Sequence, residues 1–366
     1  MFSRKNQFLL LLFASTIFFA VYLAGFTFRK ADPQIKVSEK ITQSINLPRP
    51  EIKKNFIADL KKTPESDSED ELSSDMSSSF RGNPAHESGK DVITLAFAGD
   101  VMLGRSVMQK YLELNDYTYP FQKVADRLKK ADLVFVNLEN PIIADCPIHT
   151  GGFKFCSPPQ SIEGLLFAGV DVVTLANNHS ANYGEKGIED TINFLENEGI
   201  LATGIGRLVT KGVRGTKFGF LGFNKAQQTN PLLTPSEIDL IRESDRKVDV
   251  LIIAMHWGVE YQNTALPGVS KLAKDLVAMG ADVVVGHHPH WVQNSELING
   301  PPWKDGSAYA RPVYYSLGNF IFDQMWSEET RKGLLVVLTY EDGKFIKEDK
   351  YKTYIREIGQ PEISEN

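Results

Sequence analysis

This sequence has few cysteines and no excess of basic residues. Its 366 residues include two cysteines, too few for a disulfide framework or for a cluster of thiolate metal ligands. The 46 acidic residues outnumber the 40 Lys and Arg residues, and the resulting net charge of −6 argues against a general nucleic-acid binder, which carries a basic excess. No phosphate-binding GxxxxGK[ST] loop and no internal repeat are visible, so nothing in the sequence indicates ATP use or a repeat architecture.

A long uncharged apolar run near the amino terminus is the clearest indication of cellular location. Residues 8–28 read FLLLLFASTIFFAVYLAGFTF, with two basic residues on each side. A bilayer core about 30 Å thick needs roughly 20 helical residues, which this run supplies. We expect residues 1–7 to be cytoplasmic and residues 8–28 to form a single-pass signal anchor in the cell membrane, with the rest of the chain outside the cytoplasm. A cleaved signal peptide is the alternative, but its apolar region is usually shorter.

Residues 29–90 have the composition of a flexible linker. The stretch 64–90, PESDSEDELSSDMSSSFRGNPAHESGK, is rich in Ser, Asp and Glu and has almost no large apolar residues. Such a segment cannot bury enough surface to offset the entropy of ordering it. We therefore expect one folded domain at 91–358, followed by a short tail at 359–366.

From residue 91 the sequence alternates apolar runs of strand length with amphipathic stretches of helical length. The expected strands are 92–99, 132–138, 171–177, 216–223, 249–257, 282–288 and 312–320. The expected helices are 119–130, 184–198, 235–246 and 270–279. Buried strands that alternate with helices indicate an α/β fold whose sheet is covered by helices. The last part of the chain instead predicts a hairpin that turns at residues 341–344.

Polar residues follow most of these strands at the point where each strand ends. Five of the seven histidines fall there, together with carboxylate and amide side chains. The residues at these ends are Asp100, Glu139, Asn178, His179, His256, His287, His288, His290 and Asn319. In open α/β folds, ligands bind at the carboxyl ends of the strands. The clustering therefore favours one functional site over scattered core histidines.

This set of side chains supplies imidazole, carboxylate and amide ligands and no thiolate. Such ligands suit Mn, Fe, Zn or Mg. A bridging carboxylate and several histidines are able to hold two divalent ions about 3.5–4 Å apart, which would polarise a phosphoryl group and activate a water. A histidine that directly follows an asparagine ligand, as in Asn178-His179, is well placed to donate a proton to a leaving oxygen.

The motifs GDVMLGR, NLENP, LANNHSANYG, HWGVEY, GHHPH and YSLGNFIFD occur in this order over roughly residues 92–325. In this combination they resemble the CapA family of poly-γ-glutamate capsule proteins, which shares the calcineurin-like metallophosphoesterase fold. The resemblance implies a four-layer α/β/β/α sandwich with one or two divalent metal ions. It implies metal ligands at Asp100, Glu139, Asn178, His256, His288 and His290, and catalytic roles for Asp100, Asn178 and His179. Which two of His287, His288 and His290 face the metal stays open in the sequence.

Two positions depart from the related patterns. The wider phosphoesterase superfamily has Asp-x-His in its first motif, whereas this chain has Met102 two residues after Asp100. Because a thioether is a poor ligand for hard divalent ions, this change weakens or empties one metal position. The relatives read NNHxxDYG, and here Asn182 replaces the aspartate. The change either removes a charged partner of His179 or is neutral at a helix N-cap, where Asn and Asp serve alike, and we favour the neutral interpretation.

Other residues are candidates for structural or binding roles. Cys146 and Cys156 are ten residues apart and predict a disulfide if the domain is exported, with two buried free thiols as the alternative. A guanidinium suits a phosphate or carboxylate, so Arg105 is a candidate for anion binding, although a solvated surface arginine is an equal alternative. The residues assigned to substrate contacts are Arg105, Glu260, His287 and Asn319.

Three functions remain open from the sequence. The first is a role in poly-γ-glutamate synthesis or export, with the membrane, the anionic polymer and a capsule-synthesis membrane complex as partners and no nucleic acid. The second is a metal-dependent phosphoesterase that acts on an envelope substrate, and the third is a non-catalytic module that binds an anionic polymer. Poly-γ-glutamate has amide linkages and no phosphate, so the fold alone does not supply a reaction.

Overall fold

The structure is a computed structural model, and it describes residues 92–302 and 310–364. The predicted signal anchor at 8–28 and the predicted linker at 29–90 lie outside the described residues. Within the described ranges, no helix combines the length and the apolar character that a membrane span needs.

Eight strands form the first sheet, and its centre is parallel while one side is antiparallel. The strands along the sheet are β14 (Gln360–Ile363), β13 (Lys344–Glu357), β12 (Lys332–Glu341), β1 (Val92–Val101), β2 (Leu133–Leu138), β3 (Val172–Thr174) and β4 (Leu201–Thr203), with β11 (Asn319–Ile321) also paired to β1. Strands β1 to β4 pair in parallel, so their carboxyl ends reach the same edge. The pairs β1–β12, β12–β13 and β13–β14 are antiparallel.

Six strands form the second sheet, which is parallel apart from its two edges. In order they are β5 (Val209–Val213), β6 (Thr216–Ala226), β7 (Val250–Gly258), β8 (Val283–His287), β10 (Ala310–Tyr314) and β9 (Ser295–Asn299). Strands β6, β7, β8 and β10 pair in parallel, whereas β5 and β9 are antiparallel edges.

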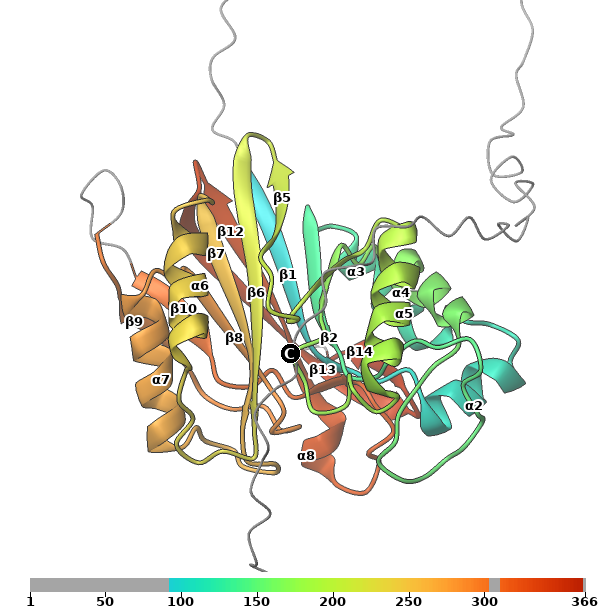
Figure 1. The fold of residues 1–366 in the computed structure, drawn as a ribbon. Coiled ribbons are helices and arrows are strands. Elements are labelled where there is room, and N and C mark those ends of the chain that lie inside the picture. Colours follow the sequence, from blue (N-terminus) through green and yellow to red (C-terminus); the bar gives the residue numbers. More distant parts are fainter. Residues whose placement is uncertain (1–91, 303–309, 365–366) are drawn as a thin grey trace, which may run out of the picture. The chain divides into compact units, whose positions relative to one another are not determined.

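Helices cover the outer face of each sheet, as Figure 1 shows for α4 and α5 on one side and α6 and α7 on the other. The helices that contribute to the core beside the first sheet are α2 (Arg105–Glu113), α3 (Ala125–Leu128), α4 (Ile162–Phe167) and α5 (Gly184–Asn197). Those beside the second sheet are α6 (Pro235–Asp245) and α7 (Pro267–Ala278). The short elements η1 (Tyr119–Phe121), η2 (Pro159–Ser161) and α8 (Glu328–Arg331) lie in connections.

Three clusters of buried side chains separate these layers, and the alternation of strand residues produces them. In β1, Ile93, Leu95 and Phe97 join the cluster between the sheets, whereas Ala96 and Ala98 join the cluster under α2 to α5. Strand β7 alternates in the same way between the middle cluster and the cluster under α6 and α7. Successive side chains of a strand point to opposite faces, so a strand that is apolar throughout must be covered on both sides. The molecule is therefore a mixed α/β structure with two packed sheets.

The predicted strand at 312–320 is wrong as a single element. The structure divides it into β10 of the second sheet and β11 of the first, so the chain passes between the sheets within a few residues. The turn uses Gly318 at φ +69°, a conformation that glycine adopts without strain. The predicted helix at 119–130 is likewise divided, into η1 and α3. The predicted hairpin at 341–344 is confirmed, because Glu341 pairs with Lys344 between β12 and β13.

The carboxyl-terminal boundary at residue 358 falls inside the first sheet. Strand β14 pairs with β13 beyond that position, with Ile355 opposite Pro361 and Thr353 opposite Ile363. The folded unit therefore extends at least to Ile363, and the stretch 359–366 is not simply a tail.

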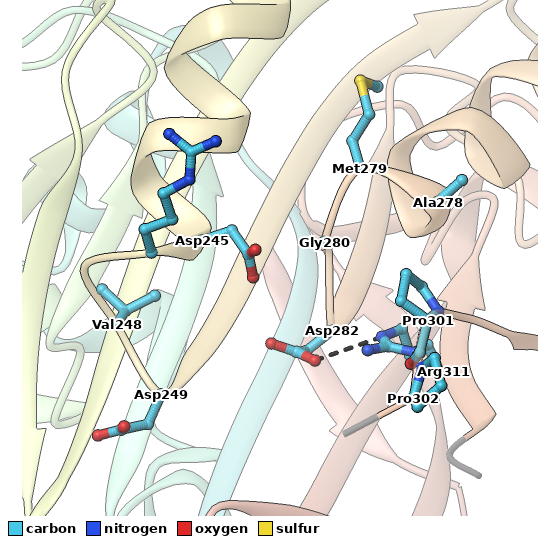
Figure 2. Close-up of a pocket in the computed structure, with 11 residues that line it drawn as sticks. Asp245, Val248, Asp249, Ala278, Met279, Gly280, Asp282, Pro301, Pro302 and Arg311 are labelled. Carbon is cyan, nitrogen blue, oxygen red and sulfur yellow. Dashed lines mark hydrogen bonds and ion pairs between the residues drawn. The ribbon is translucent and has the colours of Figure 1, made fainter. Parts of the chain in front are cut away.

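A buried ion pair joins three strands of the second sheet at their amino ends. The Asp282 carboxylate accepts a hydrogen bond from the Leu251 amide (2.8 Å) and lies 3.3 Å from Arg311 Nε. Both residues line a cavity of about 330 Å³. Figure 2 shows the contact between their side chains. Burial, opposed by these two partners, raises the pKa of Asp282 to about 6. This cavity lies at the strand ends opposite to those that carry the predicted site residues.

Gly99 permits a close backbone approach that places the following residue, Asp100. A Cβ atom at Gly99 would lie 1.9 Å from the Gly318 carbonyl oxygen, and the Asp100 amide donates a 2.9 Å hydrogen bond to that same oxygen.

We expect Gly99→Ala to lower the free energy of unfolding by about 1–3 kcal/mol, because the added methyl group must displace backbone. The matched control is Gly212→Ala in β5, where a Cβ atom meets nothing within 4 Å. Urea denaturation of both variants measures the difference. Equal stability of the two variants would contradict the close approach.

Candidate metal centre

The carboxyl ends of five strands, three from the first sheet and two from the second, converge on one cluster of polar side chains. Asp100 belongs to the end of β1, and Glu139 directly follows β2. Asn178 and His179 follow β3, while His256 lies near the end of β7. His287 is the last residue of β8, and the turn after it contributes His288 and His290. The structure thus brings together the residues that the sequence placed at strand ends.

Asp100 is fully buried and is surrounded by nitrogen atoms. Its Oδ1 accepts a 2.9 Å hydrogen bond from Asn137 Nδ2 and lies 3.1 Å from His287 Nδ1. Its Oδ2 lies 3.2 Å from His290 Nδ1. Burial alone would raise the pKa of Asp100, but the hydrogen bonds and charges of His287 and His290 outweigh it and hold the pKa well below its ordinary value. Asp100 is therefore an ionised carboxylate at neutral pH.

Glu139 is 0% exposed, and its Oε1 has no hydrogen-bond partner among the described residues. Three imidazole nitrogens surround that oxygen: His179 Nε2 at 4.0 Å, His256 Nε2 at 3.9 Å and His290 Nε2 at 3.9 Å. Burial, followed by the negative charge of Asp100, raises the pKa of Glu139 well above its ordinary value. A buried carboxylate oxygen that lacks a hydrogen bond and lies this close to three imidazole nitrogens fits the role of a metal ligand.

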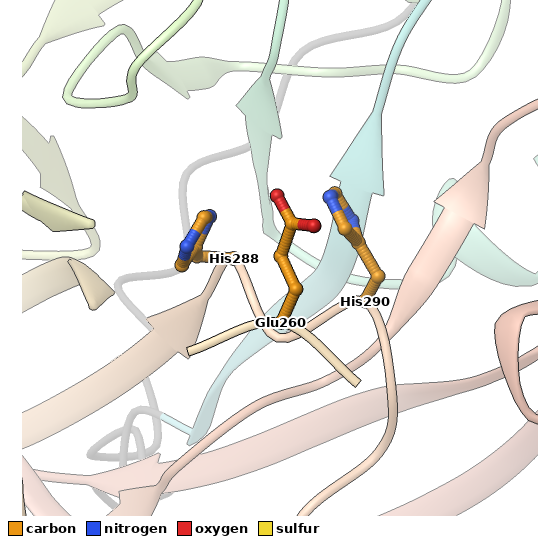
Figure 3. Close-up of side chains that lie close together, drawn as sticks. All are labelled: Glu260, His288 and His290. Carbon is orange, nitrogen blue, oxygen red and sulfur yellow. The ribbon is translucent and has the colours of Figure 1, made fainter. Parts of the chain in front are cut away.

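The turn after β8 aims two histidines at the same region. His288 has φ +95° and His290 has φ +59°, values that are uncommon for residues with a side chain. Both ring nitrogens of His288 are buried without a hydrogen-bond partner in the described part of the chain. Figure 3 shows the Glu260 carboxylate between the rings of His288 and His290. The ligand atoms of these three residues all lie within 4.8 Å of one another.

A second group of close ligand atoms consists of Asp100, Glu139 and His290, again within 4.8 Å of one another. His290 belongs to both groups. Two atoms bound to one ion at about 2.1 Å each lie no more than about 4.2 Å apart, so the spacings around Glu139 Oε1 fit a shared ion. Oxygen and imidazole donors with no thiolate suit Mn, Fe, Zn or Mg. The residues present therefore fit one or two divalent ions.

Glu260 and His287 lie differently from their predicted roles. Both are assigned to substrate from the sequence, but the Glu260 carboxylate lies among metal-ligand candidates, and His287 Nδ1 lies 3.1 Å from Asp100 Oδ1. His256 Nε2 lies 2.8 Å from Asn178 Oδ1, so the ligand atoms of these two predicted ligands converge.

His179 has a defined proton position. Its Nδ1 faces two oxygen atoms, the Phe153 carbonyl at 3.1 Å and Asn182 Oδ1 at 3.2 Å. Burial is the main cause that lowers the pKa of His179 to about 4, so the ring is neutral at pH 7 and carries its proton on Nδ1. The lone pair on Nε2 then points toward Glu139. In this state Nε2 is able to accept a proton, and the donor role of His179 stays a prediction.

The two departures from the related motifs have structural explanations. The Met102 side chain is fully buried in the core under α2 to α5, and its sulfur accepts a 3.1 Å contact from the Gly104 amide. It therefore fills core space and faces away from the ligand groups. Asn182 contacts His179, and the N-cap of α5 is Tyr183, so the N-cap interpretation that we favoured from the sequence is wrong.

Arg105 and Asn319, both assigned to substrate from the sequence, are each held by other side chains of the protein. Arg105 is ion-paired with Asp323, so its charge is already compensated, unlike a free anion-binding arginine. Asn319 Oδ1 lies 2.9 Å from His290 Nδ1, while Asn319 Nδ2 donates to the Thr330 carbonyl at 2.9 Å. These contacts orient the His290 ring.

Two asparagines without a role predicted from the sequence contact residues of the cluster. Asn137 Nδ2 contacts both Asp100 and Glu139, and Asn177 Nδ2 donates to Asn137 Oδ1 at 3.0 Å. Asn177 Oδ1 also accepts the His179 amide at 3.1 Å. The period of two along β2 would have placed Asn137 on the same face as Glu139.

Cys146 and Cys156 form a disulfide with their Cα atoms 5.8 Å apart. The loop that it closes lies against the cluster, because the Phe155 ring stacks on His179 with centroids 3.9 Å apart.

Comparison with known proteins agrees with the motifs. The profile of the family described as bacterial capsule synthesis protein PGA_cap matches residues 94–324, more than half of the chain. The chain belongs to this capsule synthesis family. It is similar to the capsule biosynthesis protein CapA of Bacillus anthracis, at 30% identity over 72% of this chain and 68% of that protein. It is also similar to the PGA biosynthesis protein CapA of Bacillus subtilis (strain 168), at 31% identity over 67% of each.

Two solved structures that match this capsule synthesis family member have lower sequence identity to it. A phosphatase from Mycoplasma pneumoniae is 17% identical, with a TM-score of 0.46 over 72% of this chain and 94% of that one. The NAD nucleotidase of Haemophilus influenzae is 12% identical, with a TM-score of 0.42 over 75% of this chain and 61% of that one.

The metal-free protein is expected to lose stability as the pH falls from about 6.5 to about 4. Burial lowers the pKa values of His179 to about 4 and of His288 to about 3, and it also lowers that of His256. These rings stay neutral in the folded state while the unfolded chain protonates them below about 6.5. Glu139 and Asp282 act in the opposite direction because their pKa values are raised, but they are two groups against three histidines. Burial opposes Glu139 and Asp100, which raise the pKa of His290 to about 9, so the stabilisation from this ring changes mainly above this pH range.

Unfolding free energies measured against pH in the presence of a chelator test this prediction. His179→Gln should reduce the loss, since it removes one of the three groups. Stability that stays constant or rises over this pH range would contradict neutral buried rings.

Proposed function

We propose that this protein takes part in the synthesis or export of an anionic capsule polymer such as poly-γ-glutamate, and that its strand-end cluster binds a divalent metal. The observation that supports the metal most directly is Glu139 Oε1, buried without a hydrogen bond and ringed by three imidazole nitrogens. The proposed ligands are Asp100, Glu139, Asn178, His256, Glu260, His288 and His290. Membership of the capsule synthesis family supports the polymer role.

Different residues of the chain have different roles around this centre. Asn137 and Asn319 orient the ligands, because the first contacts Asp100 and Glu139 and the second contacts His290. A bound divalent ion would supply Lewis-acid polarisation of a substrate carbonyl or phosphoryl oxygen. His179 accepts a proton at Nε2, because the contacts at Nδ1 hold the other proton in place. The arrangement supports hydrolysis or transfer at a polarised centre.

A metal-dependent phosphoesterase acting on an envelope substrate is the second candidate. It is favoured by the free Nε2 lone pair of His179 beside the ligand cluster, which a purely polymer-binding module does not need. The two candidates are compatible, because capsule assembly can include a metal-assisted transfer. A module that binds polymer without turnover is the third.

Metal content and turnover of the full chain, purified in detergent, distinguish these functions. The assay uses phosphomonoesters and phosphodiesters with Mn, Zn, Fe or Mg. We expect His179→Gln to retain the metal and to lower turnover by about 10²–10⁴-fold, a range typical of a lost proton acceptor. We expect Glu139→Gln to lose metal as well, because its orphaned oxygen is a proposed ligand. Asp275→Asn, on the exposed face of α7, is the matched control.

The possible outcomes separate the candidates. Metal binding without turnover on any ester leaves the polymer role and argues against a phosphoesterase. Failure to bind any of the four metals would contradict the proposed centre and both catalytic functions.

The proposed location is the outer face of the cell membrane, with residues 8–28 as the anchor. Its support is the apolar run itself and the disulfide, since disulfides persist in oxidising compartments.

Protease treatment of intact protoplasts tests this location. We expect the full chain to sediment with membranes and to be digested from outside, whereas a cytoplasmic marker protein stays intact. Protection of the domain until the membrane is lysed would contradict the proposed orientation.

A further inference from the structure

The loop closed by the Cys146–Cys156 disulfide is exposed and has no regular structure. Residues 147–154 lie outside any helix or strand, and the Phe153 side chain is 82% exposed. Just beyond the disulfide, the backbone of Ser157 pairs with Pro141 and Ile143, which fixes the base of the loop. Phe155 is the one buried apolar side chain that the segment 147–155 inserts into the body of the protein.

This loop contacts His179 and also Asn182, whose Oδ1 faces His179 Nδ1. The Phe153 carbonyl lies 3.1 Å from His179 Nδ1, and the Phe155 ring stacks on the His179 ring at 3.9 Å with an angle of 19°. The Phe155 amide donates a 2.6 Å hydrogen bond to Asn182 Oδ1. Only the amide oxygen of Asn182 is able to accept this bond. The Asn182 atom that faces His179 Nδ1 is therefore also the oxygen, Oδ1.

The same loop also contacts Arg105 and its neighbour. Arg105 Nη1 donates to the Gly152 carbonyl at 3.0 Å, and the guanidinium carbon lies 4.4 Å from the centre of the Phe155 ring. Ser106 Oγ lies 3.4 Å from the Thr150 carbonyl oxygen. One loop therefore contacts residues that follow β1 and residues that follow β3.

We propose that the disulfide-closed loop, through Phe155 and the Phe153 carbonyl, orients His179 and fixes its proton on Nδ1. Phe155 and the two cysteines are positioning residues, because they act through His179 without entering the ligand cluster. The orientation of His179 does not depend on the proposed function. Only the role of His179 Nε2 as a proton acceptor rests on that function. Without the cross-link an exposed segment of this length samples many conformations, so the carbonyl and the ring leave His179 part of the time.

The proton position on His179 is measurable without any turnover. The chain has seven histidines, so labelling only histidine with ¹⁵N gives a simple spectrum of the full-length protein in detergent. The ring ¹⁵N shifts distinguish a protonated from an unprotonated nitrogen, and the His179→Gln spectrum assigns the signals. In metal-free wild type at pH 7 we expect His179 as a single Nδ1–H form.

Three changes should disturb this form: Cys146→Ser combined with Cys156→Ser, mild reduction of the folded wild type, and Phe155→Leu. In each, we expect the His179 signals to broaden or to shift toward the average of the two neutral forms. Phe155→Tyr keeps the stacking ring and should restore the wild-type signals. Phe153→Ala is the matched control, because it removes an exposed side chain and keeps the carbonyl that contacts His179. His256, whose partner is Asn178, should be unchanged throughout.

Unchanged His179 signals in the reduced protein and in Phe155→Leu would overturn the proposal, even if the double cysteine variant fails to fold. Where the protein shows turnover, the same variants should lower kcat by about 10–100-fold with bound metal unchanged, the range for lost supporting contacts at metal sites. Absence of turnover in wild type would count against the enzyme and would leave the NMR result decisive for the loop.

Discussion

Two carboxylates, Asp100 and Glu139, are buried at the ends of neighbouring strands, and the rest of the site is arranged around them. Burial of one ionised carboxylate is costly, and a second beside it adds repulsion. The protein compensates Asp100 with Asn137, His287 and His290, while one oxygen of Glu139 is left without a hydrogen bond. A divalent cation would remove both costs at once, because it would neutralise the pair and bind the oxygen that has no hydrogen bond. The imidazole nitrogens of His256 and His290 around that oxygen would then be ligands of the same cation.

The fold creates this arrangement by joining two sheets at one edge. Parallel strands bring Asp100, Glu139 and the segment of Asn178 to the same edge of the first sheet, and β7 and β8 do so for the second. The remaining geometry comes from backbone conformations that ordinary strands lack. Positive φ angles at His288 and His290 turn both rings inward, and such strain persists where the surrounding structure fixes it. The Gly318 turn moves Asn319 from the second sheet to the first, where its amide holds His290.

Strand periodicity and strand-end chemistry were enough to predict which side chains the structure brings together, because the carboxyl ends of parallel strands meet at one edge of a sheet. They did not predict which way each side chain points. His287 and His288 are neighbours in the sequence, yet one faces Asp100 and the other joins Glu260. Glu260 reaches the cluster through a loop, and β11 belongs to a different sheet from β10. Neither feature can be predicted from the pattern of apolar and polar residues along the sequence. Asn137 was missed because roles were assigned only to residues at strand ends, although the period of two along β2 places Asn137 on the same face as Glu139. Membership of the capsule synthesis family adds a role, but the reaction depends on what this cluster binds.

Crystals of the full-length protein grown with Mn²⁺ and measured for anomalous scattering test the central claim most directly. The account predicts an anomalous peak in contact with Asp100, Glu139 and His290, and Glu139 Oε1 as one of the atoms bound to it. A map with no peak among these residues, and with an ordered water hydrogen-bonded to Glu139 Oε1 instead, would contradict it.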